Sequence, residues 1–122
     1  MSRIKSTNTR PEMSVRSALH SLGFRYRLHV KGLPGTPDLV FPAKGKVVFV
    51  HGCFWHGHSC RRGLAGPMTN IDYWNEKIRR NVERDRRSAA ALRRMGWGVA
   101  VVWECQIKNG ERWVSRVVRF LA

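Results

Sequence analysis

The segment from His51 to Cys60, HGCFWHGHSC, holds five side chains that can bind a metal and two large aromatic rings. Zinc prefers tetrahedral sites built from cysteine and histidine, and a closed structural site usually takes four ligands. Cys53, Cys60, one of the segment's histidines and the distant Cys105 would complete a Cys3His set and use all three cysteines of the chain. The alternative is three buried, inert thiols. Since zinc would need only one of the three histidines, the others are available for acid or base chemistry near neutral pH.

Carboxylates form a second group of chemically capable residues. Asp38 follows Pro37 at the predicted start of a strand, where a carboxylate can project into a cleft and bind a hard cation such as magnesium. The competing interpretation is an aspartate whose only role is to stabilise a turn. Glu12 is either a second carboxylate near Asp38 or the third residue of a helix-capping box that begins at Thr9, and the residues leave both roles open.

Asp85 lies on the apolar stripe of a predicted long helix, between Val82 and Ala89. An unpaired charge there would be costly, so a partner is expected. Asp85 either orients a histidine or forms an ion pair with a neighbouring arginine, the candidates being Arg84, Arg86 and Arg87.

Hydrophobic spacing predicts the elements that must position these residues. The expected elements are a helix from Thr9 to Gly23, a strand over 24–30, strands over 39–41 and 47–50, a helix over 71–95, a strand over 99–103 and a helix over 112–122. This αβββαβα order predicts an α/β (α+β) fold, with a mixed central sheet flanked by helices.

The same periodicity predicts which side chains face the core. In the first helix these are Val15, Ala18, Leu19 and Leu22, and in the last helix they are Val114, Val117, Val118 and Leu121. In the strand over 24–30, alternation places Phe24, Tyr26, Leu28 and Val30 inward and Arg25, Arg27 and His29 outward. In the long helix the stripe runs from Ile71 through Trp74, Ile78, Val82 and Ala89 to Leu92.

Charge indicates the partner. The 122 residues carry 23 Lys and Arg against 8 Asp and Glu, a net charge of +15, with +6 on residues 1–31, +6 on 61–94 and only +1 on 32–60. Such self-repulsion favours a polyanionic partner, nucleic acid first and an anionic membrane surface second. No apolar run approaches the roughly 18 residues of a spanning helix, so we expect one soluble, cytoplasmic domain over residues 1–122.

Four motifs make the sequence recognisable: Gly35-Thr-Pro-Asp38, His51-Gly-Cys-Phe-Trp-His56, Asn81-Val-Glu-Arg-Asp-Arg-Arg87 and Val102-Trp-Glu-Cys105. Together they closely resemble the very short patch repair (Vsr) endonucleases, over essentially the whole chain. The resemblance implies a zinc-stabilised, restriction-endonuclease-like fold of the PD-(D/E)xK type. It also implies a magnesium-dependent enzyme that nicks DNA beside T:G mismatches left by deamination of 5-methylcytosine.

The resemblance also implies roles for individual residues. Asp38 and the backbone carbonyl of Val50 match the magnesium site, His56 the catalytic histidine, Asp85 its supporting aspartate, and Glu12 an acidic residue near the active site. His51 occupies the place of the motif lysine of related nucleases and would help to polarise the scissile phosphate. The zinc ligands would be Cys53, His58, Cys60 and Cys105, and the aromatic residues wedged into DNA would be Phe54, Trp55 and Trp74. For Trp74 the competing interpretation is core packing.

The match departs from the family in two places. Val50 stands where the family usually has threonine, and family members usually carry further residues before the Met-Ser-Arg-Ile stretch. The expected partner is double-stranded DNA with a T:G mismatch, bound by a monomer near the bacterial nucleoid, with mismatch-repair proteins as candidate partners. Two other functions compete: a restriction or junction-cleaving nuclease of the same fold, and a zinc-containing DNA-binding module without catalysis.

Overall fold

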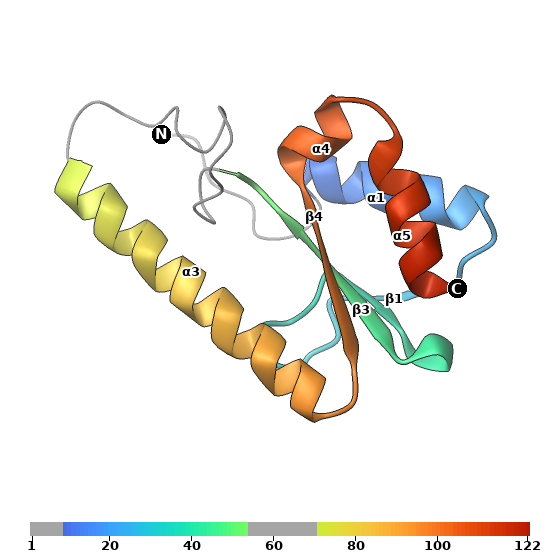
Figure 1. Ribbon diagram of the computed structural model, residues 1–122, viewed down its shortest axis with the longest axis horizontal. Coiled ribbons are helices and arrows are strands. Elements are labelled where there is room, and N and C mark those ends of the chain that lie inside the picture. The colour runs from blue at the N-terminus through green and yellow to red at the C-terminus, as the bar shows by residue number, and fades with distance from the viewer. Residues whose placement is uncertain (1–8, 54–70) are drawn as a thin grey trace.

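The computed structural model describes residues 9–53 and 71–122, which form a four-stranded sheet with helices on both faces (Figure 1). The strands are β1 (Arg27–Leu28), β2 (Leu39–Phe41), β3 (Lys46–His51) and β4 (Gly98–Trp103), and they lie in that order across the sheet. The first two pairings are antiparallel and β3 pairs with β4 in parallel. The predicted mixed sheet is thus confirmed, and the architecture is consistent with a restriction-endonuclease-like fold.

The helices are α1 (Arg10–Ser21), α3 (Ile71–Arg94), α4 (Glu104–Lys108) and α5 (Arg112–Leu121), and a short 3-10 turn, η1 (Pro42–Lys44), joins β2 to β3. The predicted element order is confirmed, with η1 and α4 as additions to it. In the described part of the chain, none of the helices combines the length and apolar character needed to cross a bilayer.

Alternating strand residues build a separate core on each face of the sheet. On one face, α1 and α5 cover a cluster that includes Val15, Leu39, Val48 and Val117. On the other face, Leu92 near the end of α3 packs against a smaller cluster that the strands supply, with Val40, Val47 and Phe49. Because consecutive strand residues point to opposite faces, His51 shares the α3 face with Val47 and Phe49.

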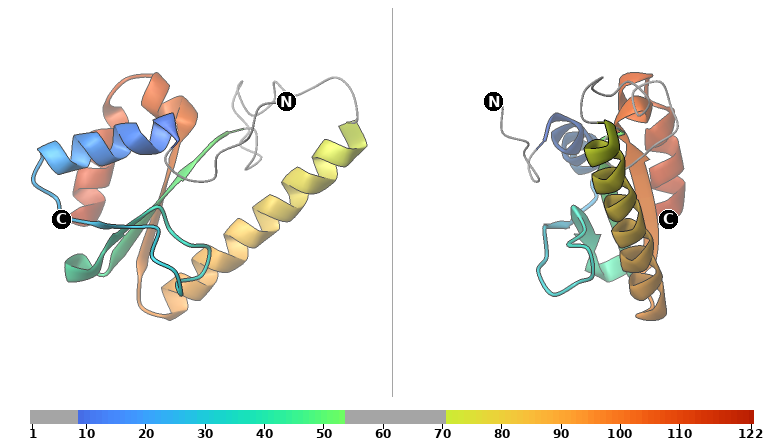
Figure 2. Two further views of the ribbon diagram at one scale, coloured as in Figure 1. Left: turned by 180° about the vertical axis from the view of Figure 1, so that it is seen from behind. Right: turned by 90° about the vertical axis from the view of Figure 1, so that its left-hand side faces the viewer.

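The helix α3 is packed along only part of its length. Its C-terminal end lies beside the sheet, and its N-terminal end projects away from it (Figures 1 and 2). The exposed fractions agree, since Leu92 is fully buried whereas Ile71, at the start of the predicted stripe, is 50% exposed. The middle turns of α3 and the end of β3 line a common cleft.

Three details of the prediction are wrong. Only Arg27–Leu28 pairs as a strand, and it ends there because His29 adopts a φ of 47°, outside the extended region, and turns the chain. Val30 therefore packs on the α3 face rather than beside Leu28. Leu22, predicted to be inward, is 55% exposed at the C-cap of α1.

In α5 the buried residues are Trp113, Val117 and Leu121, so the helix turns more toward Trp113 than predicted and leaves Val114 and Val118 only half-buried.

Candidate active site

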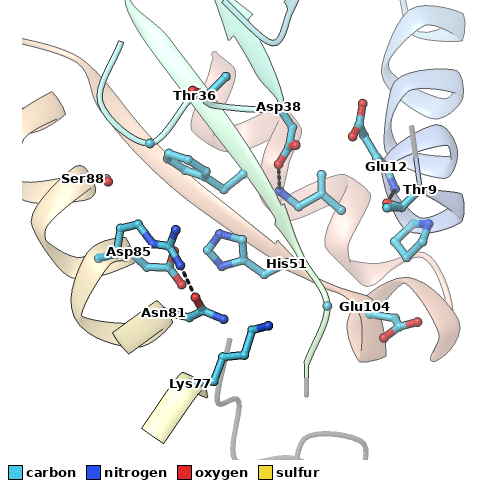
Figure 3. Close-up of a pocket in the computed structure, with 16 residues that line it drawn as sticks. Thr9, Glu12, Thr36, Asp38, His51, Lys77, Asn81, Asp85, Ser88 and Glu104 are labelled. Atoms are coloured by element: carbon cyan, nitrogen blue, oxygen red, sulfur yellow. Dashed lines mark hydrogen bonds between the residues drawn. The ribbon is translucent and has the colours of Figure 1, made fainter. Parts of the chain in front are cut away.

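One end of the sheet gathers the polar residues that the sequence singled out. Because β2 runs antiparallel to β1 and β3, the start of β2 lies beside the ends of both neighbours, and β4 ends beside β3. Asp38 precedes β2, His51 ends β3 and Glu104 follows β4. Within the described residues these side chains line a cleft of about 660 Å³, which α3 closes on the far side (Figure 3).

Asp38 is held in this cleft by a backbone contact and has a raised pKa. Its Oδ2 accepts a 2.7 Å hydrogen bond from the backbone N–H of Val50, which fixes the carboxylate against the end of β3. Burial raises the pKa of Asp38 from 3.8 to about 6, with further raising by the charge of Glu12 and by a hydrogen bond between the two carboxyl groups. The Val50 N–H and His29 lower this pKa, but burial outweighs them. A raised pKa of a carboxyl that lines a cleft favours the functional interpretation of Asp38 over the turn interpretation.

The side chain of Glu12 also points into the cleft and is almost fully buried. Its backbone N–H donates to Oγ1 of Thr9 at 3.3 Å, so the predicted N-terminal cap of α1 is confirmed. Its carboxylate, in contrast, lies 3.4 Å from Nη1 of Arg16 and beside Asp38 and His29. The Thr9 half of the predicted capping box is thus present, whereas the Glu12 carboxylate lies beside Asp38, as the alternative interpretation expected.

His29 completes this cluster, and the sequence analysis missed it. Its Nε2 lies 2.8 Å from Oε2 of Glu12 and 3.9 Å from Oδ1 of Asp38. The alternation of residues 24–30 predicted an outward side chain, but the positive φ of His29 rotates it inward. One signal could have found it: a histidine at the end of one strand and an aspartate at the start of the next, antiparallel strand come to lie side by side.

His51 lies on the same cleft but on its α3 side. It is 6% exposed and packs edge-on against Trp103, with ring centroids 5.2 Å apart, and beside Phe49 at 5.5 Å. Asp85 and Asn81 extend from α3 toward it (Figure 3). The structure therefore brings together four of the five predicted catalytic residues, which are Asp38, Asp85, His51 and Glu12.

Two of the predicted zinc ligands lie together at the other side of this sheet end. Cys53, just after β3, is fully buried, and its Sγ accepts a 3.4 Å hydrogen bond from the backbone N–H of Cys105 at the start of α4. The parallel pairing of β3 with β4 brings these distant positions together. Cys53 and Cys105, 52 positions apart in the sequence, are thus neighbours at this end of the sheet.

The other predicted site residues lie outside the described residues: Phe54, Trp55, His56, His58 and Cys60. Trp74 lies on the projecting part of α3, half-buried, with its ring edge-on to Tyr73 at a centroid distance of 5.1 Å. The ammonium of Lys77 lies 5.9 Å from the centre of the Trp74 ring.

The basic residues of α3 differ in their surroundings. Arg79 is bound by two glutamates, at 2.6 Å from Glu76 and 2.8 Å from Glu83, and its charge is locally balanced. Lys77 and Arg84 instead line the cleft. The positively charged side chains of Lys77 and Arg84 can bind a negatively charged substrate, such as a phosphodiester, in the same cleft as the two carboxylates.

Comparison with known proteins identifies the family. A family model described as DNA mismatch endonuclease Vsr matches residues 1–62. The chain is 58% identical over 109 residues to the type II nicking enzyme V.XorIIP of Xanthomonas oryzae pv. oryzae, a match that covers 89% of this chain and 79% of the relative. The chain belongs to the Vsr family of DNA mismatch endonucleases.

Two further relatives agree. The type II nicking enzyme V.NmeAIP of Neisseria meningitidis is 49% identical over 89% of this chain and 77% of its own length. The DNA mismatch endonuclease Vsr of Escherichia coli is 41% identical over 92% of this chain and 71% of its own length. The predicted resemblance to Vsr is confirmed, and the chain is an enzyme of the DNA endonuclease class of hydrolases.

Proposed function

We propose that this Vsr-family enzyme nicks one strand of duplex DNA beside a T:G mismatch, in a reaction that depends on Mg²⁺. The observation that carries the proposal is the close pair of carboxylates, the buried Glu12 and the half-buried Asp38, in a cleft that Lys77 and Arg84 also line. Pure DNA binding needs basic side chains but gains nothing from two buried acids. A metal-dependent phosphodiesterase needs both.

The residues present fit a hard divalent cation. Asp38, the backbone carbonyl of Val50 and Glu12 offer oxygen atoms, which Mg²⁺ prefers. The raised pKa of Asp38 reflects burial and repulsion from Glu12, which a cation between the two carboxylates would relieve. The chemistry that a cation supplies in such a site is neutralisation of the negative charge that develops on phosphate oxygens.

The remaining steps fall to the protein's own side chains. His56, oriented by Asp85, accepts the proton of the attacking water, and His51 stabilises the phosphate beside it. The basic flanks grip the DNA backbone, which accounts for the net charge of +15. Phe54, Trp55 and Trp74 insert at the mismatch, where unstacking costs less than in paired DNA.

A structural zinc ion bound by Cys53, His58, Cys60 and Cys105 belongs to the same proposal. Its support is the hydrogen bond from the Cys105 N–H to Cys53 Sγ, which brings two of the four proposed ligands together. Elemental analysis should find one zinc per chain, and Cys105→Ser should lower both the zinc content and the melting temperature. Full zinc content and unchanged melting in that variant would make Cys105 an ordinary thiol.

The proposed partner is duplex DNA with a mismatch. We propose that the protein binds it as a single-domain monomer in the cytoplasm. The deciding experiment incubates the purified chain and Mg²⁺ with three DNA substrates of the same flanking sequence. One is a fully paired duplex, one a duplex with a T:G mismatch, and one a branched DNA. We expect a single nick next to the T:G pair and little cleavage elsewhere. Equal cleavage of paired or branched DNA would favour a restriction or junction nuclease. Tight binding without any nick would favour a DNA-binding module.

A further inference from the structure

The contact between His29 and the two carboxylates has an unusual geometry. The Nε2 atom of His29 is buried and 2.8 Å from Oε2 of Glu12, yet it makes no directed hydrogen bond within the described residues. A buried imidazole nitrogen normally satisfies its hydrogen-bonding capacity, since leaving it unmet costs about 1–3 kcal/mol. The nitrogen and the carboxylate are close, but they are not aligned as donor and acceptor.

The three side chains lie close together instead. One atom each of Glu12, His29 and Asp38 can be chosen so that all three lie within 4.8 Å of one another. Ligand atoms lie about 2.0–2.6 Å from a bound divalent cation, so two ligands of one ion are at most about 4–5 Å apart. The cluster therefore has the dimensions of a coordination site with two oxygens and one nitrogen.

The backbone holds the imidazole in this position. His29 adopts a φ of 47°, a left-handed conformation that residues other than glycine rarely take, and its N–H donates to the carbonyl oxygen of Asp38 at 3.3 Å. Strained backbone that persists is over-determined by its surroundings and clusters at functional sites. The hydrogen bond holds the backbone of His29 beside that of Asp38.

We propose that Nε2 of His29 is a protein ligand of the cation held by Glu12 and Asp38, and that it makes the site bind Mn²⁺ more tightly than Mg²⁺. Imidazole is a good ligand for first-row transition ions, whereas Mg²⁺ strongly prefers oxygen. Mn²⁺ accepts both kinds of ligand and has little affinity for a thiolate zinc site. This inference rests on the proposed function for the cation's role in catalysis, but not for its binding.

The test measures metal binding to the zinc-replete chain in the absence of DNA. Mn²⁺ is titrated by electron paramagnetic resonance and Mg²⁺ by competition against it, for the wild type, His29→Gln and the matched control His20→Gln on the exposed side of α1. In His29→Gln we expect Mn²⁺ affinity to fall about tenfold or more, the range seen even when partners of a metal ligand are removed. Mg²⁺ affinity should change less than Mn²⁺ affinity, and His20→Gln should match the wild type for both ions.

Pulsed electron paramagnetic resonance of the bound Mn²⁺ detects a directly bound nitrogen in the wild type itself. This readout therefore does not depend on how well a variant folds. The wild type should show coupling to a directly bound histidine nitrogen, and His29→Gln should lose that coupling. Absence of the coupling in the wild type would overturn the proposal, as would equal losses of Mn²⁺ and Mg²⁺ affinity in the variant, since the imidazole would then only hold the carboxylates in place. Failure to nick T:G duplexes despite His29-dependent Mn²⁺ binding would refute the proposed function and leave this inference intact.

Discussion

Replacing Asp38 by asparagine should stabilise the folded protein while it removes activity. A pKa raised from 3.8 to about 6 means that ionising Asp38 costs the folded state about 3 kcal/mol more than the unfolded chain. Below pH 3.8 the carboxyl is neutral in the folded and the unfolded protein, and the folded state has its full stability. That stability falls as the pH rises from 3.8 through 6, because the folded protein must then lose a proton that it holds more tightly. At neutral pH the wild type therefore carries the full cost, and a neutral asparagine avoids it.

The structure allows asparagine to fit. Its Oδ1 can accept the hydrogen bond that Oδ2 of Asp38 receives from the Val50 N–H at 2.7 Å, and its amide can donate toward Glu12. We expect Asp38→Asn to raise the free energy of unfolding at pH 7.5 by about 1–3 kcal/mol, and the melting temperature by roughly 5–10 °C.

The assay is denaturant unfolding of both proteins between pH 4 and 8, without added divalent cation. The wild type should lose stability from pH 4 to 7 relative to Asp38→Asn. Asp72→Asn is the matched control, because it makes the same change in net charge at an exposed position. Added Mg²⁺ should stabilise the wild type and not Asp38→Asn. A variant less stable than the wild type at pH 7.5, or one with the same pH dependence, would refute the reasoning.

Two further predictions concern the walls of the cleft. A Cβ at Gly35 would lie 2.7 Å from Cβ of Ser88, whereas at Gly32 it would meet nothing within 4 Å, and both glycines have positive φ. Gly35→Ala should therefore lower the free energy of unfolding by about 1–3 kcal/mol more than Gly32→Ala, and equal losses in denaturant unfolding would show that only backbone strain matters. Arg84→Ala should weaken DNA binding and reduce the salt dependence of the binding constant by about one counterion, while Arg79→Ala, whose charge two glutamates already balance, should do less; equal effects of the two variants would contradict this.

The fold could be predicted largely because its signals are local. Adjacent residues are enough to predict several of its elements. Examples are the cap at Thr9, the glycine that ends α1, and the short apolar runs of β2, β3 and β4. The short helix α4 and the burial of Trp113 were missed because five helical residues contain too little periodicity to detect, and because tertiary packing sets the rotation of α5.

The roles of Asp38 and His51 were predicted through the resemblance to the Vsr family, because the residues alone left a turn aspartate and one of three histidines as alternatives. The place of His29 in the candidate site was missed, because the decisive feature is a single positive φ that no propensity predicts for histidine. A period-two pattern assumes that the backbone stays extended. One left-handed residue at its end reverses the face on which the side chain lies.

Glu12 shows how one residue can serve both the fold and the chemistry. A Thr-x-x-Glu pattern predicts that the glutamate returns to the start of its own helix, and that role would satisfy its carboxylate locally. In this chain the helix start is served by the contact between the Glu12 N–H and Thr9 Oγ1, and the carboxylate lies buried beside Asp38. Placing Asp38 in this cleft beside Glu12 raises the free energy of the metal-free protein at neutral pH, chiefly through the burial of Asp38 and further through the charge of Glu12. A fold selected for stability alone would place an apolar residue at one of these positions, so the pair supports the proposed cation site.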